Sequence, residues 1–143
     1  MPDEEIVIHN KSGHRIPSRK FFIQNIKKTL KVLGERKKIM LALVFISPQE
    51  SKKLNKYWRK KDKVALILSF PLKDIVSSTS ESLGDIFFCP QEIEKQSASY
   101  GLSRNVFYRK LTIHSLLHLY GYTHKRKNDT KQMELLEAKI LQQ

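Results

Sequence analysis

Cysteine is almost absent from the sequence, since Cys89 is the single cysteine in 143 residues and no disulfide can form within the chain. No apolar run approaches the roughly 18 residues that a membrane-spanning helix needs, and the acidic start lacks the basic and apolar regions of a signal peptide. Glycine and proline are also scarce, at five each, and no repeat or Gly/Ser/Pro-rich linker divides the chain. These absences predict one cytoplasmic domain over residues 1–143, without disulfides and without a membrane partner.

Acidic residues are outnumbered, with 14 Asp and Glu against 27 Lys and Arg and a formal net charge of +13. The excess is concentrated in residues 1–63, which hold 17 basic and 6 acidic residues. A basic surface of this kind attracts phosphate backbones or acidic membranes, and the sequence contains no amphipathic membrane helix or lipidation signal. The charge therefore favours a nucleic-acid partner, although a basic face that is merely solvated is also consistent with it.

Apolar runs predict the strands of a sheet. Two continuous runs predict buried strands, the first covered on both faces, over residues 39–46 and 64–70. Shorter strands are expected at residues 6–8 and 85–88, with a polar loop between the last two strands at residues 77–82.

Capping residues and helical periodicity predict five helices. Ser18 and Ser47 are expected N-caps, and Gly34 is expected to end the first helix. The helices are expected at residues 18–34, 47–58, 90–101, 105–120 and 130–141. The fourth is apolar around most of its circumference, so it should lie in the middle of the domain. Strands interleaved with helices predict an α+β fold with a mixed sheet.

Three of the five histidines fall within eleven residues, as His114, His118 and His124. The first two are i and i+4 on the predicted central helix, so they share one face and can offer two ring nitrogens to one ion. Gly121 can end the helix and turn the chain back, which lets His124 supply a third nitrogen. Three neutral imidazoles suit zinc and leave one position open for water, as in catalytic sites. The alternative is that the histidines extend the apolar stripe of a core helix.

The same spacing occurs in the metalloprotease signature H-E-x-x-H-x-x-G-x-x-H, but Ser115 stands where those proteases have their general-base glutamate. A serine hydroxyl cannot take a proton from metal-bound water near neutral pH. The motif therefore predicts a metal site and disfavours a peptidase.

Basic and aromatic residues alternate in the segment 52–63, which contains seven Lys and Arg around Tyr57 and Trp58. Such a segment can hold phosphates and stack bases, unless the two aromatic rings pack in the core and the lysines are only solvated. A second basic cluster, residues 125–127, directly follows the third histidine. A metal next to phosphate-binding charge suggests phosphodiester hydrolysis.

Further motifs occur in the same order as in one known family. The pattern H-G-x-L-H-L-x-G-y-D-H is matched at His114, Leu117, His118, Leu119, Gly121, Tyr122 and His124. Other matches are Asn55, Tyr57, Arg59, Lys61, Asp62, Leu68–Pro71, Gly84–Ile86, Met133 and Glu137. Through these residues the sequence resembles the YbeY family of bacterial metal-dependent endoribonucleases, which are linked to ribosomal RNA maturation. The resemblance implies a mostly parallel sheet packed with helices, and a three-histidine metal site at the end of a central buried helix.

The resemblance also implies a function: a metal-dependent endoribonuclease that prefers single strands, acts on ribosomal RNA in maturation and quality control, and works with the small ribosomal subunit. One zinc ion per chain would be bound by His114, His118 and His124. Arg59 and His114 are the expected catalytic residues, Arg59 stabilising charge on the phosphoryl oxygens. The expected substrate-binding residues are Arg59, Lys60, Lys61, Ser69, Phe70, Lys125, Arg126 and Lys127.

The sequence departs from the family pattern at three places. Residues 64–66 are Val-Ala-Leu where the family usually has Pro-Thr-Asp, and Ser115 and Thr123 replace a glycine and an aspartate of the histidine motif. The lost aspartates remove acceptors that could orient a ligand, and no carboxylate has a spacing that identifies a general base. The alternative function is a non-enzymatic ribosome- or RNA-binding module with a structural zinc, which the open fourth position of a three-histidine site disfavours.

Overall fold

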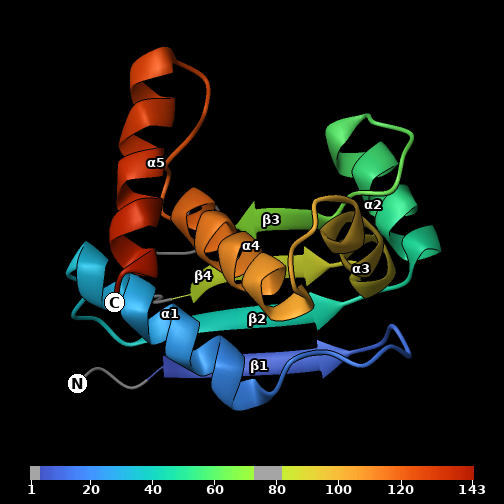
Figure 1. Cartoon of the computed structure of the whole chain (residues 1–143), viewed down its shortest axis with the longest axis horizontal. Helices are drawn as coiled ribbons and strands as arrows, with labels where there is room; N and C mark the ends of the chain where they lie inside the picture. The colour runs from blue at the N-terminus through green and yellow to red at the C-terminus, as the bar shows by residue number, and fades with distance from the viewer. Residues whose placement is uncertain (1–3, 73–81) are drawn as a thin grey trace.

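The computed structural model describes residues 4–72 and 82–143 of the chain. These residues form four strands and five helices, which alternate along most of the sequence (Figure 1). In chain order they are β1 (Glu4–Asn10), α1 (Arg19–Leu33), β2 (Ile39–Phe45), α2 (Pro48–Arg59), β3 (Ile67–Pro71), β4 (Ser82–Phe88), α3 (Pro90–Ser99), α4 (Arg104–Leu119) and α5 (Lys127–Leu141). Of the loop predicted at residues 77–82, all but Ser82 lies outside the described residues, and Ser82 begins β4.

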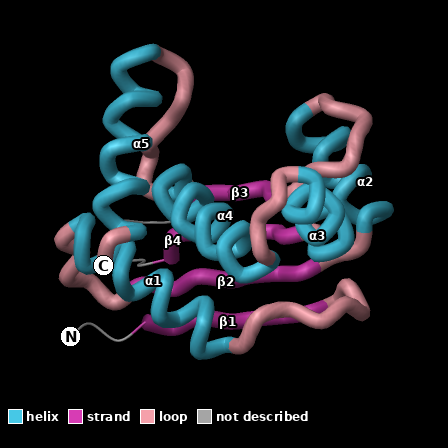
Figure 2. Tube along the Cα trace, in the orientation of Figure 1, coloured by secondary structure: helices cyan, strands magenta, loops and turns pink. Residues whose placement is uncertain are grey.

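The four strands form one mixed sheet in the order β1-β2-β4-β3. Strand β2 pairs in parallel with β1 and β4, and β3 pairs antiparallel with β4. Helices α1, α3 and α4 lie across one face of this sheet, with α5 packed beside α1 and α4 (Figure 2). The predicted α+β fold with a mixed, mostly parallel sheet is therefore confirmed.

Local capping chemistry determines where several helices begin and end. The hydroxyl groups of Ser18 and Ser47 accept hydrogen bonds of 3.2 Å from the backbone N–H groups of Phe21 and Glu50. Gly34 takes a left-handed conformation at φ 72° and ends α1. These three predicted caps are confirmed, because each depends on residues only a few positions apart.

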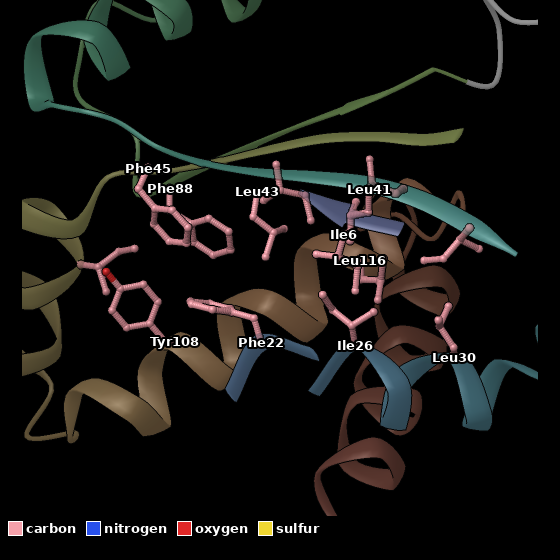
Figure 3. Packing of buried hydrophobic residues seen from close by; sticks show 14 of the residues in the cluster. Ile6, Phe22, Ile26, Leu30, Leu41, Leu43, Phe45, Phe88, Tyr108 and Leu116 are labelled. Carbon is pink, nitrogen blue, oxygen red and sulfur yellow. The ribbon is translucent and has the colours of Figure 1, made fainter. Parts of the chain in front are cut away.

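The core lies between the sheet and the helices on its covered face (Figure 3). From β2, alternate residues Leu41, Leu43 and Phe45 are buried against α1 and α4. The residues between them face the other way, and Met40 is 43% exposed. The prediction that this strand is covered on both faces is wrong, because the helices that pack on the sheet gather on one side of it.

The second apolar run also differs from its prediction. Strand β3 begins at Ile67 rather than Val64 and forms an edge of the sheet, and Leu68 is its one fully buried residue. The segment before β3 instead holds α2 in place. The Ser51 hydroxyl donates to the Ala65 carbonyl at 2.8 Å and accepts from the Ala65 N–H at 2.9 Å. The Asn55 side-chain amide donates to the Lys63 carbonyl at 2.9 Å. These contacts fix α2 beside the edge strand.

Other boundaries shift by a few residues. Strand β1 extends beyond the predicted residues 6–8, and β4 and α5 each begin three residues before the predicted positions 85 and 130. Helix α4 occupies the middle of the fold, in contact with α1, α3, α5, β3 and β4, as its apolar circumference predicts. Every helix in the described ranges is too short or too polar to cross a lipid bilayer.

Gly84 of β4 pairs with Pro71 of β3 at a point where there is no room for a side chain. Its φ of 134° is unfavourable for residues with a side chain, and a Cβ there would collide with the carbonyl oxygen of Phe70. We expect Gly84→Ala to lower the free energy of unfolding by about 2–3 kcal/mol, because it combines backbone strain with a steric clash. Urea denaturation would measure this loss, and an unchanged midpoint would contradict the close approach of the two strands.

Candidate active site

The end of α4 brings three histidine rings together. His114 and His118 lie one helical turn apart on α4, and the chain reverses at Gly121, whose φ is 97°. The Gly121 N–H donates to the carbonyl of His118 at 3.0 Å, which closes the helix end. His124 then returns to the other two rings, and one nitrogen from each histidine lies within 4.8 Å of the others. The predicted cluster is confirmed, and it lies at the end of the central helix.

Hydrogen bonds set the orientation of two of these rings. His118 Nδ1 lies 2.9 Å from the backbone carbonyl of Tyr122, and His114 Nδ1 lies 3.3 Å from the carboxylate of Glu137 on α5. A carbonyl or carboxylate oxygen can only accept, so Nδ1 of each ring donates the proton. In the neutral tautomers, Nε2 of each ring then carries a free lone pair, which is the form that binds a metal.

The two Nε2 atoms face each other at a distance of 2.9 Å. Two free lone pairs at this distance repel each other, and an ion that accepts electron pairs from both removes the repulsion. Burial, followed by repulsion from His114, lowers the pKa of His118, which keeps that ring neutral and able to act as a ligand near neutral pH. The geometry and protonation of the donor set therefore fit a metal ion.

Glu137 has a role here that the sequence did not reveal. It matches a family position, but it is 23 residues from His114, and no local spacing connects the two. The carboxylate both orients the ring and makes its nitrogen a stronger ligand, as acidic partners of metal-binding histidines do. It also supplies an acceptor near the metal cluster, where the family aspartate is replaced by Thr123.

A cleft of about 490 Å³ opens beside the histidines. Its walls come from α2, β3, α4 and the turn after α4, and they consist of Arg59, Ile67, Ser69, Pro71, His114, Ser115, His118, Tyr122, Thr123 and Lys125. The fold thus brings two cationic side chains, Arg59 and Lys125, to the same cleft as two of the histidines. Since Arg59 is more than fifty residues from His114 in sequence, the edge position of β3 and the attachment of α2 beside it create this site.

Arg59 is held at one wall of the cleft. Its Nη2 donates to the backbone carbonyl of Ser69 at 2.8 Å, and its guanidinium carbon lies 5.7 Å from the centre of the Phe70 ring. Guanidinium groups have five N–H donors, so this anchor leaves donors free for a ligand in the cleft. The group is therefore oriented and able to bind an anion.

Of the other predicted substrate-binding residues, the structure places some in the lining of the cleft and others outside it. Phe70 supports Arg59 without forming part of the wall, and the exposed side chains of Lys60, Lys61, Arg126 and Lys127 lie outside the lining of the cleft. Tyr57 and Trp58 are 68% and 59% exposed, so the alternative that they pack in the core is wrong. Both rings lie on the solvent side of α2.

Ser115 occupies the position where the metalloprotease signature has its general-base glutamate. Its side chain is 1% exposed at the wall of the cleft, and its hydroxyl has no hydrogen-bond partner among the described residues. A neutral serine hydroxyl is a poor proton acceptor, so it does not replace the general-base glutamate. Ser115 stands where the family pattern has a glycine.

Comparison with known proteins agrees with this geometry. The family model described as Endoribonuclease YbeY matches residues 7–143. The chain belongs to the YbeY family. It is 36% identical over 132 residues to the Endoribonuclease YbeY of Buchnera aphidicola subsp. Acyrthosiphon pisum, covering 92% of this chain and 83% of the relative. It is 38% identical over 139 residues to that of Phytoplasma mali, covering 96% and 86%.

A solved structure supports the fold assignment separately. The solution structure of a protein from Thermotoga maritima superimposes with a TM-score of 0.60 over 96% of this chain and 89% of that chain. The sequences are 21% identical, so this likeness supports the architecture alone. The resemblance seen in the sequence motifs to the YbeY family is confirmed by the family match and by its relatives.

Proposed function

We propose that this protein is a metal-dependent endoribonuclease that hydrolyses phosphodiester bonds in single-stranded regions of RNA. The observation that carries the proposal is the cleft in which His114 and His118, part of a three-histidine cluster, lie beside Arg59 and Lys125. A metal-binding cluster next to two cations suits a substrate with a phosphate backbone. The relatives from Buchnera aphidicola and Phytoplasma mali carry the name endoribonuclease, which supports this assignment.

In this proposal His114, His118 and His124 hold one ion, and zinc suits their three neutral imidazole nitrogens. A metal ion held by these residues would supply Lewis-acid chemistry toward the phosphoryl group. His114 belongs to the catalytic set through its position in this cluster. Glu137 and the Tyr122 carbonyl orient the rings so that their Nε2 atoms face each other.

Arg59 stabilises the negative charge that develops on the phosphoryl oxygens. Its anchor on the Ser69 carbonyl fixes the guanidinium group before substrate binds, so little reorganisation is needed during the reaction. Lys125, on the opposite segment after α4, attracts the same phosphate or its neighbour. Lys61, Arg126 and Lys127 are exposed around these walls and attract the strand over a longer range.

Ribosomal RNA is the proposed substrate, with the small ribosomal subunit as the particle that presents it during maturation and quality control in the cytoplasm. The resemblance to the YbeY family and the net charge of +13 support this part of the proposal. The whole chain would act as one endoribonuclease domain, since the cleft draws residues from α2, β3 and α4.

The rival function is an RNA-binding module with a structural zinc. Structural zinc sites are usually closed by four protein ligands, whereas the cluster here has three members among the described residues. The nearest additional carboxylate, Glu137, bonds to the far nitrogen of His114 instead of joining the cluster. This arrangement favours a catalytic site.

Metal removal tests the proposal directly. We expect purified protein to contain about one transition-metal ion per chain and to cleave a ribosomal RNA fragment with single-stranded loops. A chelator should abolish cleavage, and added zinc should restore it. Cleavage that continues in the metal-free protein would contradict metal dependence, and RNA binding without cleavage by the metal-loaded protein would favour the binding module.

A further inference from the structure

A second concave surface lies on the outer face of α2, outside the metal cleft. It has a volume of about 850 Å³ and is lined by Lys53, Leu54, Lys56, Tyr57, Lys60 and Asp62. The opposite face of α2 is held to the segment before β3 through Ser51 and Asn55, so the concave face points to solvent. Figure 1 shows α2 at the edge of the molecule.

Two large aromatic rings are exposed on this helix, and they are held in place. The Tyr57 and Trp58 rings meet edge to face, with their centres 4.9 Å apart. The centres of the Trp58 and Phe70 rings are 5.9 Å apart. Phe70 in turn contacts Phe87 of β4 at 5.6 Å, which connects the rings to the sheet. The Tyr57 ring, 68% exposed, is thus a preordered flat surface at the concave face.

Positive charge surrounds the Tyr57 ring. Lys53 and Lys56 have no ion-pair partner in the described part of the chain. Lys60 Nζ donates to the Tyr57 backbone carbonyl at 3.3 Å and lies over the Tyr57 ring, 5.9 Å from its centre. Asp62 is the one carboxylate in the lining, and its charge is offset by Lys52 at 3.9 Å. An exposed aromatic ring among ammonium groups is complementary to a nucleobase with its flanking phosphates.

Lys60 connects this surface to the metal cleft. It directly follows Arg59, which lines the cleft, and it ends α2 with a left-handed φ of 61°. It is the one described residue other than glycine with a positive φ. This left-handed residue closes the helix, since its N–H donates to the Lys56 carbonyl at 3.2 Å.

We infer that the concave face of α2 is a subsite for an unpaired nucleotide, whose base stacks on Tyr57 while its phosphates bind Lys53, Lys56 and Lys60. The inference rests on the proposed function, since the ligand is the RNA strand that enters the cleft at Arg59. A base in a duplex is stacked on both sides and cannot lie on the ring, so this subsite selects single-stranded RNA.

Binding of a short oligonucleotide tests the subsite without any cleavage. The probe is an eight-nucleotide 2′-O-methyl oligouridine, compared with an abasic oligonucleotide that has the same number of phosphates. Trp58 is the single tryptophan and contacts Tyr57, so its fluorescence reports occupancy. Because stacking contributes roughly 1–3 kcal/mol per base, we expect the oligouridine to bind the wild type at least about five-fold more tightly than the abasic strand.

Substitutions identify the ring that is responsible. Tyr57→Ala should abolish the preference for the oligouridine and leave affinity for the abasic strand unchanged, whereas Tyr57→Phe should retain the preference because the ring remains. Tyr100→Ala is the matched control, since Tyr100 is 67% exposed but contacts Phe107 on α4. Unchanged metal content and thermal unfolding of each variant would show that the fold is intact.

Two outcomes overturn the inference. One is equal affinity of the wild type for both strands, and the other is a base preference that survives in Tyr57→Ala, which would leave this face to a protein partner. Failure of the proposed function has a different outcome. If the protein shows Tyr57-dependent base binding but does not cleave RNA, the subsite is supported and the nuclease assignment is refuted.

Discussion

Replacing His118 by alanine is expected to lower metal affinity by more than about a hundred-fold and to reduce RNA cleavage in proportion to the lost metal. Both ring nitrogens of His118 have close partners: its Nδ1 is bonded to the Tyr122 carbonyl, and its Nε2 lies 2.9 Å from that of His114. Loss of this ring leaves two ligands, one of them the exposed His124. Elemental analysis after dialysis would measure the bound metal, and cleavage would be followed on the same samples.

Two comparison variants make this result specific. His9→Ala removes an exposed histidine of β1, outside the cluster, and should leave metal content and cleavage unchanged. Glu137→Ala removes only the partner of His114 and should weaken metal binding by about ten- to a hundred-fold. Full metal content in His118→Ala would refute the three-histidine site.

The three-histidine cluster could be predicted from sequence because its geometry is local. His114 and His118 share a helix face by their i, i+4 spacing, and Gly121 provides the turn that returns His124. The same is true of the caps at Ser18 and Ser47, where the hydroxyl reaches a backbone N–H three residues away. When interacting residues are only one or two helical turns apart in the sequence, their spacing is enough to predict the contact.

Partners that are distant in sequence could not be predicted in this way. Glu137 approaches His114 only because α5 packs against α4, and Arg59 reaches the Ser69 carbonyl only because α2 lies beside the edge strand β3. An apolar run gives no information about strand order, so β3 reads like a buried central strand although it lies at an edge. The burial of these strands depends on where the helices pack.

Neighbouring residues in sequence also need not share a site. The side chains of successive helix residues point about 100° apart. Arg59 is the last residue of α2, and Lys60, which follows it, has a left-handed backbone conformation. Arg59 therefore lines the metal cleft while Lys60 lines the outer concave face. The segment 52–63 reads as one basic cluster in sequence, but the fold divides it between two surfaces.

Arg59→Lys separates a catalytic arginine from a merely basic surface. Lysine keeps the positive charge but has a single ammonium group, which cannot bond the Ser69 carbonyl and a phosphoryl group with the planar geometry of a guanidinium. If charge alone matters, the variant should bind and cleave RNA like the wild type. Arg36→Lys provides the control, because Arg36 is exposed in the turn after α1 and has no place in the cleft.

We expect Arg59→Lys to retain its metal and to bind RNA within a few-fold of the wild type, yet to cleave it about a hundred- to a thousand-fold more slowly. This range corresponds to roughly 2.7 to 4 kcal/mol, which is the usual effect of removing one oriented donor to the transition state. Single-turnover cleavage at saturating protein would isolate the chemical step from binding. Because the three histidines are unchanged, a wild-type rate in the metal-loaded variant would remove Arg59 from the catalytic set and leave it as one of many basic residues on this face.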